Sequence, residues 1–247
     1  MSLAGKKALV TGGGSGVGAV IARALAEAGA QVIICGRRQA PLEAVAREHE
    51  AISALTCDIT DEAQVCALFK QAGPLDIVVA NAGASESAPF ARTSLESFKD
   101  MVTVNLTGTF LTLREGVKAM EGRNGRLIAI ASSAVLKGYA YVAPYAAAKH
   151  GVVGLVKSIA LEYARKNITA NAVCPGFLDT EMTQRTIANI VEKTGRSSQE
   201  ARASLEASNP MQRLVPPEEV ARAVLWLCSE GASMVTGQAI SISGGEV

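Results

Sequence analysis

The stretch KALVTGGGSGVGAVIARALAEAG, residues 7–29, decides the fold of this chain. Residues 7–11 form a short apolar run that predicts a buried strand, and residues 16–29 have the apolar spacing of an amphipathic helix. Between them, the glycine-rich turn TGGGSGVG allows backbone N–H groups to approach a ligand closely. The helix N-terminus directs further N–H groups and a positive dipole end to the same place. We therefore expect a diphosphate-binding turn, although a purely structural turn is the alternative.

The same alternation of short apolar runs and longer amphipathic segments continues outward along the chain. Six more strands are predicted, at 30–36, 52–58, 75–83, 125–133, 168–176 and 237–245. The predicted helices lie at 16–29, 40–50, 61–73, about 94–120, 144–166 and 216–229. Strands that are apolar on both faces belong to a parallel sheet that helices cover on both sides.

We therefore expect a single doubly wound α/β domain of Rossmann type over residues 1–247, with a seven-stranded parallel sheet and helices on both faces. A polar segment at 179–213 interrupts the alternation of strands and helices. Its position, between the last strand-end motif and the next helix, predicts a small helical lid that controls substrate specificity.

Charge and composition exclude several classes of function. The 247 residues carry 24 basic and 23 acidic side chains, a net charge of +1, and only 4% aromatic residues. Neither an electrostatic nor a stacking basis for nucleic-acid binding is present. Without a long apolar run or a signal region, we expect a cytoplasmic protein with no membrane partner. The five cysteines form no CxxC pair, so we expect reduced core thiols and no metal site.

The end of the second predicted strand, CGRRQ at 35–39, bears on the choice of nucleotide. An acidic residue there would accept a hydrogen bond from the ribose 2′-hydroxyl of NAD. This chain has Gly36 instead, followed by Arg37 and Arg38, and a guanidinium binds a 2′-phosphate bidentately. We expect NADP(H) as the favoured cofactor and leave NAD(H) open, with two solvated loop arginines as the alternative.

In PYAAAKHG, residues 144–151, Tyr145 and Lys149 lie one helical turn apart on the same face. The ammonium favours the phenolate, so we expect a lowered tyrosine pKa and a proton-transfer role near neutral pH. An incidental pair on a half-buried helix is the alternative. The loop after the preceding strand can bring Ser132 beside the phenol, and strand alternation lets only one of Ser132 and Ser133 face that crevice.

Taken together, these motifs resemble those of the short-chain dehydrogenase/reductase family. The matching stretches run from end to end of the chain: TGGGSGVG, CDIT (57–60), NAG (81–83), VNLTG (104–108), IASS (130–133), YAAAK (145–149), NAVCPG (171–176) and SISGG (241–245). The resemblance implies that Ser132 binds the substrate oxygen, Tyr145 is the acid/base and Lys149 holds the nicotinamide ribose. It also implies that Asn105 kinks its helix and joins a proton relay.

The resemblance further implies a set of cofactor contacts. The diphosphate contacts would be Gly12, Gly14, Ser15, Gly16, Val17 and Gly18, and the nicotinamide contacts Tyr145, Lys149, Pro175, Leu178 and Thr180. Asp58 and Ile59 would border the adenine, and the adenine ribose would lie near Asn81, Ala82 and Gly83.

Two stretches, 143–164 and NAVCPGFLDTEM at 171–182, are similar to 3-oxoacyl carrier-protein reductases and aromatic polyketide ketoreductases, and the second also to 3-hydroxyacyl-CoA dehydrogenases. The resemblance implies interconversion of a ketone and a secondary alcohol, with a 3-oxoacyl thioester on carrier protein or CoA as the favoured substrate. A dehydrogenase of cyclic alcohols, sugars or steroids remains an alternative, as does a catalytically silent nucleotide-binding scaffold. Because the helix at 144–166 is apolar around most of its girth, we expect partner subunits to cover it, and the resemblance implies a homotetramer.

Overall fold

Seven parallel strands form one sheet in the order β3-β2-β1-β4-β5-β6-β7, as the sequence predicted. The computed structural model describes residues 2–247. Its strands are β1 Lys7–Thr11, β2 Gln31–Gly36, β3 Ile52–Thr56, β4 Ile77–Ala80, β5 Arg126–Ile130, β6 Thr169–Pro175 and β7 Ala239–Ile242. The strand order reverses between β1 and β4, so the loops that follow these two strands open a crevice at the carboxyl edge of the sheet.

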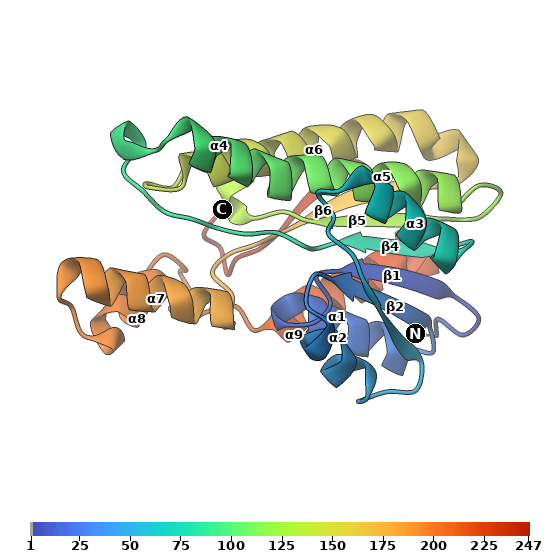
Figure 1. The fold of residues 1–247 in the computed structure, drawn as a ribbon, viewed down its shortest axis with the longest axis horizontal. Coiled ribbons are helices and arrows are strands. Elements are labelled where there is room, and N and C mark those ends of the chain that lie inside the picture. Colours follow the sequence, from blue (N-terminus) through green and yellow to red (C-terminus); the bar gives the residue numbers. More distant parts are fainter. Residues whose placement is uncertain (1) are drawn as a thin grey trace.

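Helices cover both faces of the sheet, giving three layers (Figure 1). One face carries α1 Gly16–Glu27, α2 Gln39–Ala46 and α9 Pro217–Cys228. The other carries α3 Glu62–Ala72, α4 Leu95–Val102, α5 Gly108–Ala119 and α6 Ala143–Tyr163. This arrangement confirms the doubly wound α/β fold.

The helix predicted over about 94–120 is present, and it is kinked at Asn105 as the resemblance implied. A π-helical turn, Thr103–Thr107, separates α4 from α5. Its central residue, Asn105, donates side-chain hydrogen bonds to the carbonyl oxygens of Met101 at 3.0 Å and Ala84 at 2.9 Å. The second of these partners lies on the loop after β4, so the distortion depends on a contact with a distant part of the chain.

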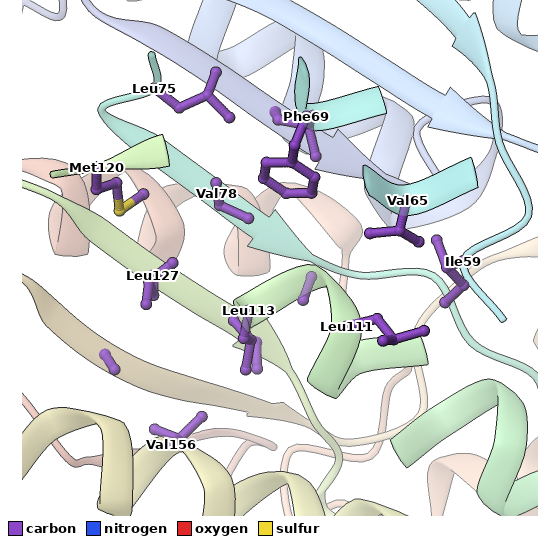
Figure 2. Packing of buried hydrophobic residues seen from close by; sticks show 14 of the residues in the cluster. Ile59, Val65, Phe69, Leu75, Val78, Leu111, Leu113, Met120, Leu127 and Val156 are labelled. Carbon is purple, nitrogen blue, oxygen red and sulfur yellow. The ribbon is translucent and has the colours of Figure 1, made fainter. Parts of the chain in front are cut away.

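An apolar layer joins the sheet to α3, α5 and α6 (Figure 2). Phe69 from α3, Leu113 from α5 and Val156 from α6 point toward Val78 and Leu127 on the central strands. Leu127 is 1% exposed, and removing such a side chain costs about 2–5 kcal/mol of unfolding free energy. The packed layers therefore form a rigid base for the loops at the carboxyl edge.

The polar segment 179–213 folds into two helices, α7 Glu181–Thr194 and α8 Ser198–Glu206, which project from the sheet (Figure 1). They enclose a small apolar cluster of their own, formed by Ile187, Ala201, Leu205 and Leu214. In addition, Asn189 Nδ2 donates to Ser87 Oγ at 3.0 Å, which connects α7 to the loop after β4. The predicted helical segment is therefore present and contacts the loop after β4, and its role as a substrate lid stays a prediction.

Two further expectations concern membrane-spanning helices and the burial of the cysteines. No helix within residues 2–247 is long and apolar enough to cross a membrane. Four cysteines are buried, but Cys66 on α3 is exposed, so the expectation that all five are core thiols is wrong for this one. Its position on the outer face of an amphipathic helix explains the difference.

Candidate active site

The glycine loop between β1 and α1 has a backbone shape that requires glycine. Gly12 and Gly16 adopt positive φ values of 67° and 53°, a region that residues with side chains rarely adopt. A Cβ at Gly18 would lie 2.4 Å from the carbonyl oxygen of Gly12, so no side chain fits there. Asn81, which follows β4, donates from Nδ2 to the carbonyl oxygen of Thr11 at 2.9 Å. The end of β4 therefore holds the start of the loop in place.

The N-terminus of α1 has the donors that a diphosphate needs. The first N–H groups of a helix have no partner within it. Apart from bonds within helices and strands, the N–H groups of Gly14, Ser15 and Gly16 donate to no main-chain carbonyl of residues 2–247. A cavity of about 580 Å³ adjoins these three residues and Thr180. The residues present therefore fit the diphosphate of a dinucleotide, with Val17 and Gly18 in the first turn behind them.

The predicted adenosine contacts lie after β2 and β3. Arg37 and Arg38 are both exposed, and a Cβ at Gly36 would touch only Leu42, at 3.7 Å. Asp58 Oδ1 accepts hydrogen bonds within the CDIT turn, from the main-chain N and the hydroxyl of the residue two positions on, at 3.0 and 2.8 Å. This bonding fixes the turn that is expected to border the adenine.

The side chain of Ile59 faces the core, and its contact with the adenine stays a prediction. Its side chain is 6% exposed and packs in the core, where a Cβ built on Gly108 of α5 would lie 2.5 Å from its Cδ1. Because the side chain points away from the crevice, Ile59 can border an adenine only through its backbone.

The structure distinguishes between the two serines at the end of β5. Ser132 caps a short 3-10 turn, Ser133–Val135, and its Oγ accepts from the main-chain N of Ala134 at 3.1 Å. The same hydroxyl lies close enough to the Tyr145 hydroxyl to lower the pKa of that tyrosine, against the larger effect of burial. Ser133 points the other way, where it is buried and lies 2.6 Å from the Tyr139 hydroxyl oxygen. The geometry therefore brings together the pair that the sequence predicted, Ser132 and Tyr145.

Lys149 lies behind Tyr145 on α6 and is almost completely buried. Its Nζ is 5.8 Å from the centre of the Tyr145 ring and donates to the carbonyl oxygen of Ile130 at 2.7 Å. Burial lowers the pKa of Lys149 to about 8. The same protein environment raises the pKa of Tyr145 above its ordinary value, although the nearby Ser132 hydroxyl partly offsets the effect of burial.

Burial raises the pKa of Tyr145 here, opposite to the lowering expected from Lys149, and the further lowering expected from the positive charge of an oxidised nicotinamide stays a prediction. Desolvation of the phenol is the largest contribution, and the buried Cys174 thiol on β6 adds to it. The sequence indicated the neighbouring cation but contained no measure of burial, which here has the greater effect.

A single glycine, Gly83, lies between the side chains of Asn105 and Lys149. Asn105 is fully buried, and a Cβ at Gly83 would lie 2.7 Å from Asn105 Oδ1 and 3.6 Å from Lys149 Nζ. The NAG segment, Asn81 to Gly83, therefore passes directly over both side chains. The four residues of the predicted catalytic set thus come from three different segments and converge on one end of the crevice.

The segment after β6 forms the other side of the site. Pro175 ends the strand, and Leu178 pairs in an isolated bridge with Val215. Thr180 precedes α7 without a side-chain capping bond, and its Cγ2 is 3.9 Å from a Cβ built on Gly16. The predicted carboxamide-binding residues therefore lie beside the glycine loop.

Two residues near the site were not found from the sequence, Tyr139 and Glu246. The Glu246 side chain is 1% exposed and lies beside the loop that carries Ser132. Neither residue belongs to a motif, so only the structure identifies them.

Comparison with known proteins agrees with this geometry. A family model described as enoyl-(acyl carrier protein) reductase matches residues 12–246. A Streptomyces coelicolor protein that carries the name of a ketoacyl reductase is 40% identical over 249 residues, covering 96% of this chain and 95% of the relative. The crystal structure of an actinorhodin polyketide ketoreductase variant with NADPH superposes with a TM-score of 0.91 at 39% identity, covering 98% of this chain and 97% of the other.

A 3-ketoacyl-(acyl-carrier-protein) reductase from Brucella melitensis, complexed with NADH, has a TM-score of 0.90 at 33% identity and covers 99% of both chains. The chain belongs to the short-chain dehydrogenase/reductase family and is an oxidoreductase of the 3-oxoacyl reductase type. Members of this family bind NAD(P)(H), which agrees with the glycine loop described above.

Proposed function

We propose that this protein is an NADP(H)-dependent reductase of 3-oxoacyl thioesters, with Asn105, Ser132, Tyr145 and Lys149 as its catalytic residues. The observation that carries the proposal is the convergence of Ser132 and Tyr145 at the end of β5, where Lys149 is buried behind them and donates to the Ile130 carbonyl oxygen at 2.7 Å. These groups lie at the carboxyl edge of the sheet, where the glycine loop would hold a dinucleotide.

The nicotinamide ring, when bound, supplies or accepts the hydride. The chain's own residues bind the reacting oxygen and move its proton. Ser132 holds the carbonyl oxygen, and the Tyr145 hydroxyl donates a proton to it in reduction or takes one from the alcohol in oxidation. The raised pKa keeps Tyr145 protonated at neutral pH, which suits the direction of reduction.

Lys149 would bind the nicotinamide ribose with its ammonium, and the direct neighbourhood of Asn105 and Lys149 supports a proton path between them. With a pKa of about 8, Lys149 can exchange protons near neutral pH more readily than an ordinary lysine. Asn105 has both its amide oxygen and nitrogen bonded to Ala84, so its orientation is well defined.

The choice of an apolar, acyl-type substrate rests on the residues that flank the crevice. Leu136 and Tyr141 lie on the loop after Ser132, and Met182 lies at the start of α7, and all three are exposed large hydrophobic residues. Apolar side chains such as Leu136 and Met182 offer no hydrogen-bond partner to the hydroxyl groups of a sugar. The names of the relatives, ketoacyl and 3-ketoacyl reductases, support the same class.

NADP(H) is proposed over NAD(H) because Arg37 and Arg38 follow β2 at the point where an NAD site would carry an acid. The solved relatives include one with NADPH and one with NADH, so the argument for a preference depends on this chain's own arginines. A guanidinium beside Gly36 supplies bidentate donors for a 2′-phosphate.

The test is a substrate panel with NADPH that contains acetoacetyl-CoA, a longer 3-oxoacyl thioester, a cyclic ketone and a sugar ketone. We expect the highest kcat/KM with a 3-oxoacyl thioester. Tyr145→Phe should abolish turnover and leave the Kd for NADPH close to that of the wild type, and Tyr163→Phe on the same helix is the matched control. Preference for the sugar or cyclic ketone, or near-normal turnover by Tyr145→Phe, would contradict the proposal.

A further inference from the structure

The loop at residues 177–180 directs its side chains alternately toward two parts of the molecule. Leu178 packs against the core on the α1 side of the sheet, and Thr180 lies beside the glycine loop. Phe177 packs instead against the separate apolar cluster of α7 and α8, and Asp179 faces α8. The two expected nicotinamide contacts and the two contacts with α7 and α8 therefore alternate along this loop.

Arg202 on α8 binds the carboxylate of Asp179 with both terminal nitrogens of its guanidinium. Nη2 donates to Asp179 Oδ2 at 3.1 Å, and Nη1 donates to Oδ1 at 3.4 Å. The same guanidinium donates from Nε to Glu206 Oε1 at 2.8 Å, one turn further along the helix. Glu206 thus restrains the plane of the guanidinium, and Arg202 meets Asp179 in the two-bonded arrangement that makes arginine–carboxylate pairs directional.

Main-chain bonds restrain the other edge of the loop at only one place. Val215 N donates to the carbonyl oxygen of Phe177 at 2.8 Å, and Asp179 N donates to that of Val215 at 3.0 Å, which forms an isolated parallel bridge. A single bridge fixes the position of the main chain at that point. The side-chain contacts of Phe177 and Asp179 with α7 and α8 are therefore needed to settle which way Leu178 and Thr180 face.

Asp179 could also act through its charge alone. It lines the cavity that adjoins Gly14 and Ser15, where a carboxylate repels the phosphates of a nucleotide. The guanidinium of Arg202 offsets this negative charge. An experiment on the pair must therefore separate the effect of charge on the phosphates from the effect of geometry on the nicotinamide.

We infer that Arg202 is a positioning residue for the nicotinamide half of the cofactor: through Asp179 it sets the direction of Leu178 and Thr180. The inference rests on the proposed roles of Leu178 and Thr180 as nicotinamide contacts. The side chains of Arg202 and Asp179 are 37% and 48% exposed, so the pair is partly screened by water. We accordingly expect effects of severalfold on binding.

Binding of two nucleotides tests the inference without turnover. NADPH carries the nicotinamide, and 2′-phospho-ADP-ribose has the same adenosine, phosphates and second ribose without it. Because both nucleotides share the phosphates, the ratio of the Kd for NADPH to that for 2′-phospho-ADP-ribose cancels the effect of charge. We expect Arg202→Met to raise this ratio by about 3- to 5-fold, as measured by calorimetry on the full chain.

Asp179→Asn removes the other half of the ion pair. If the pair acted only through charge, loss of the carboxylate would tighten the binding of both nucleotides and loss of the guanidinium would weaken both. Positioning predicts instead that the Kd ratio rises in Asp179→Asn as it does in Arg202→Met. The double variant should have a ratio no higher than either single variant, because the same contact is lost in all three.

Arg185→Met is the matched control. It removes the same charge from α7, where Arg185 Nη2 lies 3.7 Å from Glu181 Oε2 and both side chains are 75% exposed. The Kd ratio of this variant should equal that of the wild type. With the best thioester, Arg202→Met should also lower kcat by about 10-fold at an unchanged KM for the thioester, because the hydride donor is less well oriented.

An unchanged Kd ratio in Arg202→Met and Asp179→Asn would overturn the inference. Equal weakening of both nucleotides together with a lower Tm would also overturn it, since the ion pair would then only support the fold. A wild type that binds NADH but not NADPH would contradict the proposed cofactor instead, and the ratio for NADH and ADP-ribose then decides the inference. A wild type that reduces no ketone would contradict the proposed function and leave the binding test in force.

Discussion

Lys149 Nζ donates a 2.7 Å hydrogen bond to the carbonyl oxygen of Ile130, which fastens α6 to the end of β5. Only Ala131 separates Ile130 from Ser132 along the chain, and Tyr145 lies one helical turn before Lys149. One buried ammonium therefore aligns the helix that carries Tyr145 with the strand that positions Ser132. Because this charged group is removed from water, the contact has a measurable consequence for stability.

We predict that Lys149 makes stability depend on pH above neutrality. Burial lowers its pKa from 10.5 to about 8, so between these values the unfolded chain binds a proton that the folded protein does not. Stability therefore rises with pH in this window. Below it, the full free-energy cost of burying a charged ammonium lowers the stability of the folded protein. The unfolding free energy of the wild type should rise, relative to that of Lys149→Met, by roughly 3 kcal/mol from about pH 7 to the ordinary lysine pKa. Urea unfolding of both proteins at several pH values measures it, and parallel curves would contradict the prediction.

Gly83→Ala should damage the site without removing any functional group. Its Cβ would lie 2.7 Å from Asn105 Oδ1, so the buried amide must shift. We expect a loss of about 1–3 kcal/mol of unfolding free energy and at least about a tenfold lower kcat. Gly231→Ala is the control, since the nearest atom to its new Cβ is Ser229 Oγ at 3.5 Å. Steady-state kinetics and thermal unfolding of both variants give the comparison, and equal behaviour would refute the argument.

The exposed arginines after β2 should determine the choice of nucleotide. The wild type is expected to have a higher kcat/KM with NADPH than with NADH. Replacing Arg37 and Arg38 by alanine removes charge-assisted bonds to the 2′-phosphate, which lowers kcat/KM for NADPH by about 10- to 100-fold. The value for NADH should change little. An NADH preference in the wild type would show that both arginines are only solvated loop residues.

Thiol reactivity should separate Cys66 from the other cysteines. Burial raises the pKa of Cys174 to about 11 and that of Cys228 to about 12. The neighbouring Cys35 lowers the pKa of Cys57, but both of these thiols are buried and out of reach of a reagent. Only the thiolate reacts, so an aromatic disulfide reagent at about pH 8 should label one thiol in the native protein and all five after denaturation. The Cys66→Ser variant should lose the native signal, and rapid labelling of a second thiol would contradict the burial argument.

The outer face of α6 should form a contact between subunits. Leu161 is 86% exposed, and Met234, after α9, is 92% exposed, although both are large and apolar. We expect a homotetramer in solution and a smaller species for Leu161→Arg, because a buried charge without a partner opposes association. Light scattering of both proteins measures the mass, and a wild-type monomer would count against this interface.

The sheet and the glycine turn could be predicted because their signals are local. Alternating apolar runs and the spacing of Gly12, Gly16 and Gly18 depend on neighbouring residues alone. Ser132 was predicted beside Tyr145 only as one of two candidates, since alternation does not say which face Ser133 takes. The structure decides between them through Tyr139, which binds Ser133 on the opposite side of the loop.

The features that the sequence alone did not show depended on contacts between distant segments. The π-helical turn at Asn105 requires Ala84 on another loop, and the inward side chain of Ile59 requires the close approach of Gly108. The raised pKa of Tyr145 requires knowledge of its burial. None of these quantities follows from spacing along the chain.

The amino-acid sequence by itself determined the doubly wound α/β class, the nucleotide-binding turn and the residues proposed to act on a carbonyl, because hydrophobic period and backbone freedom are properties of short segments. Tertiary structure alone decided how these groups are charged and oriented. Desolvation of Tyr145 and Lys149 arises only when segments far apart in the chain exclude water from the same space.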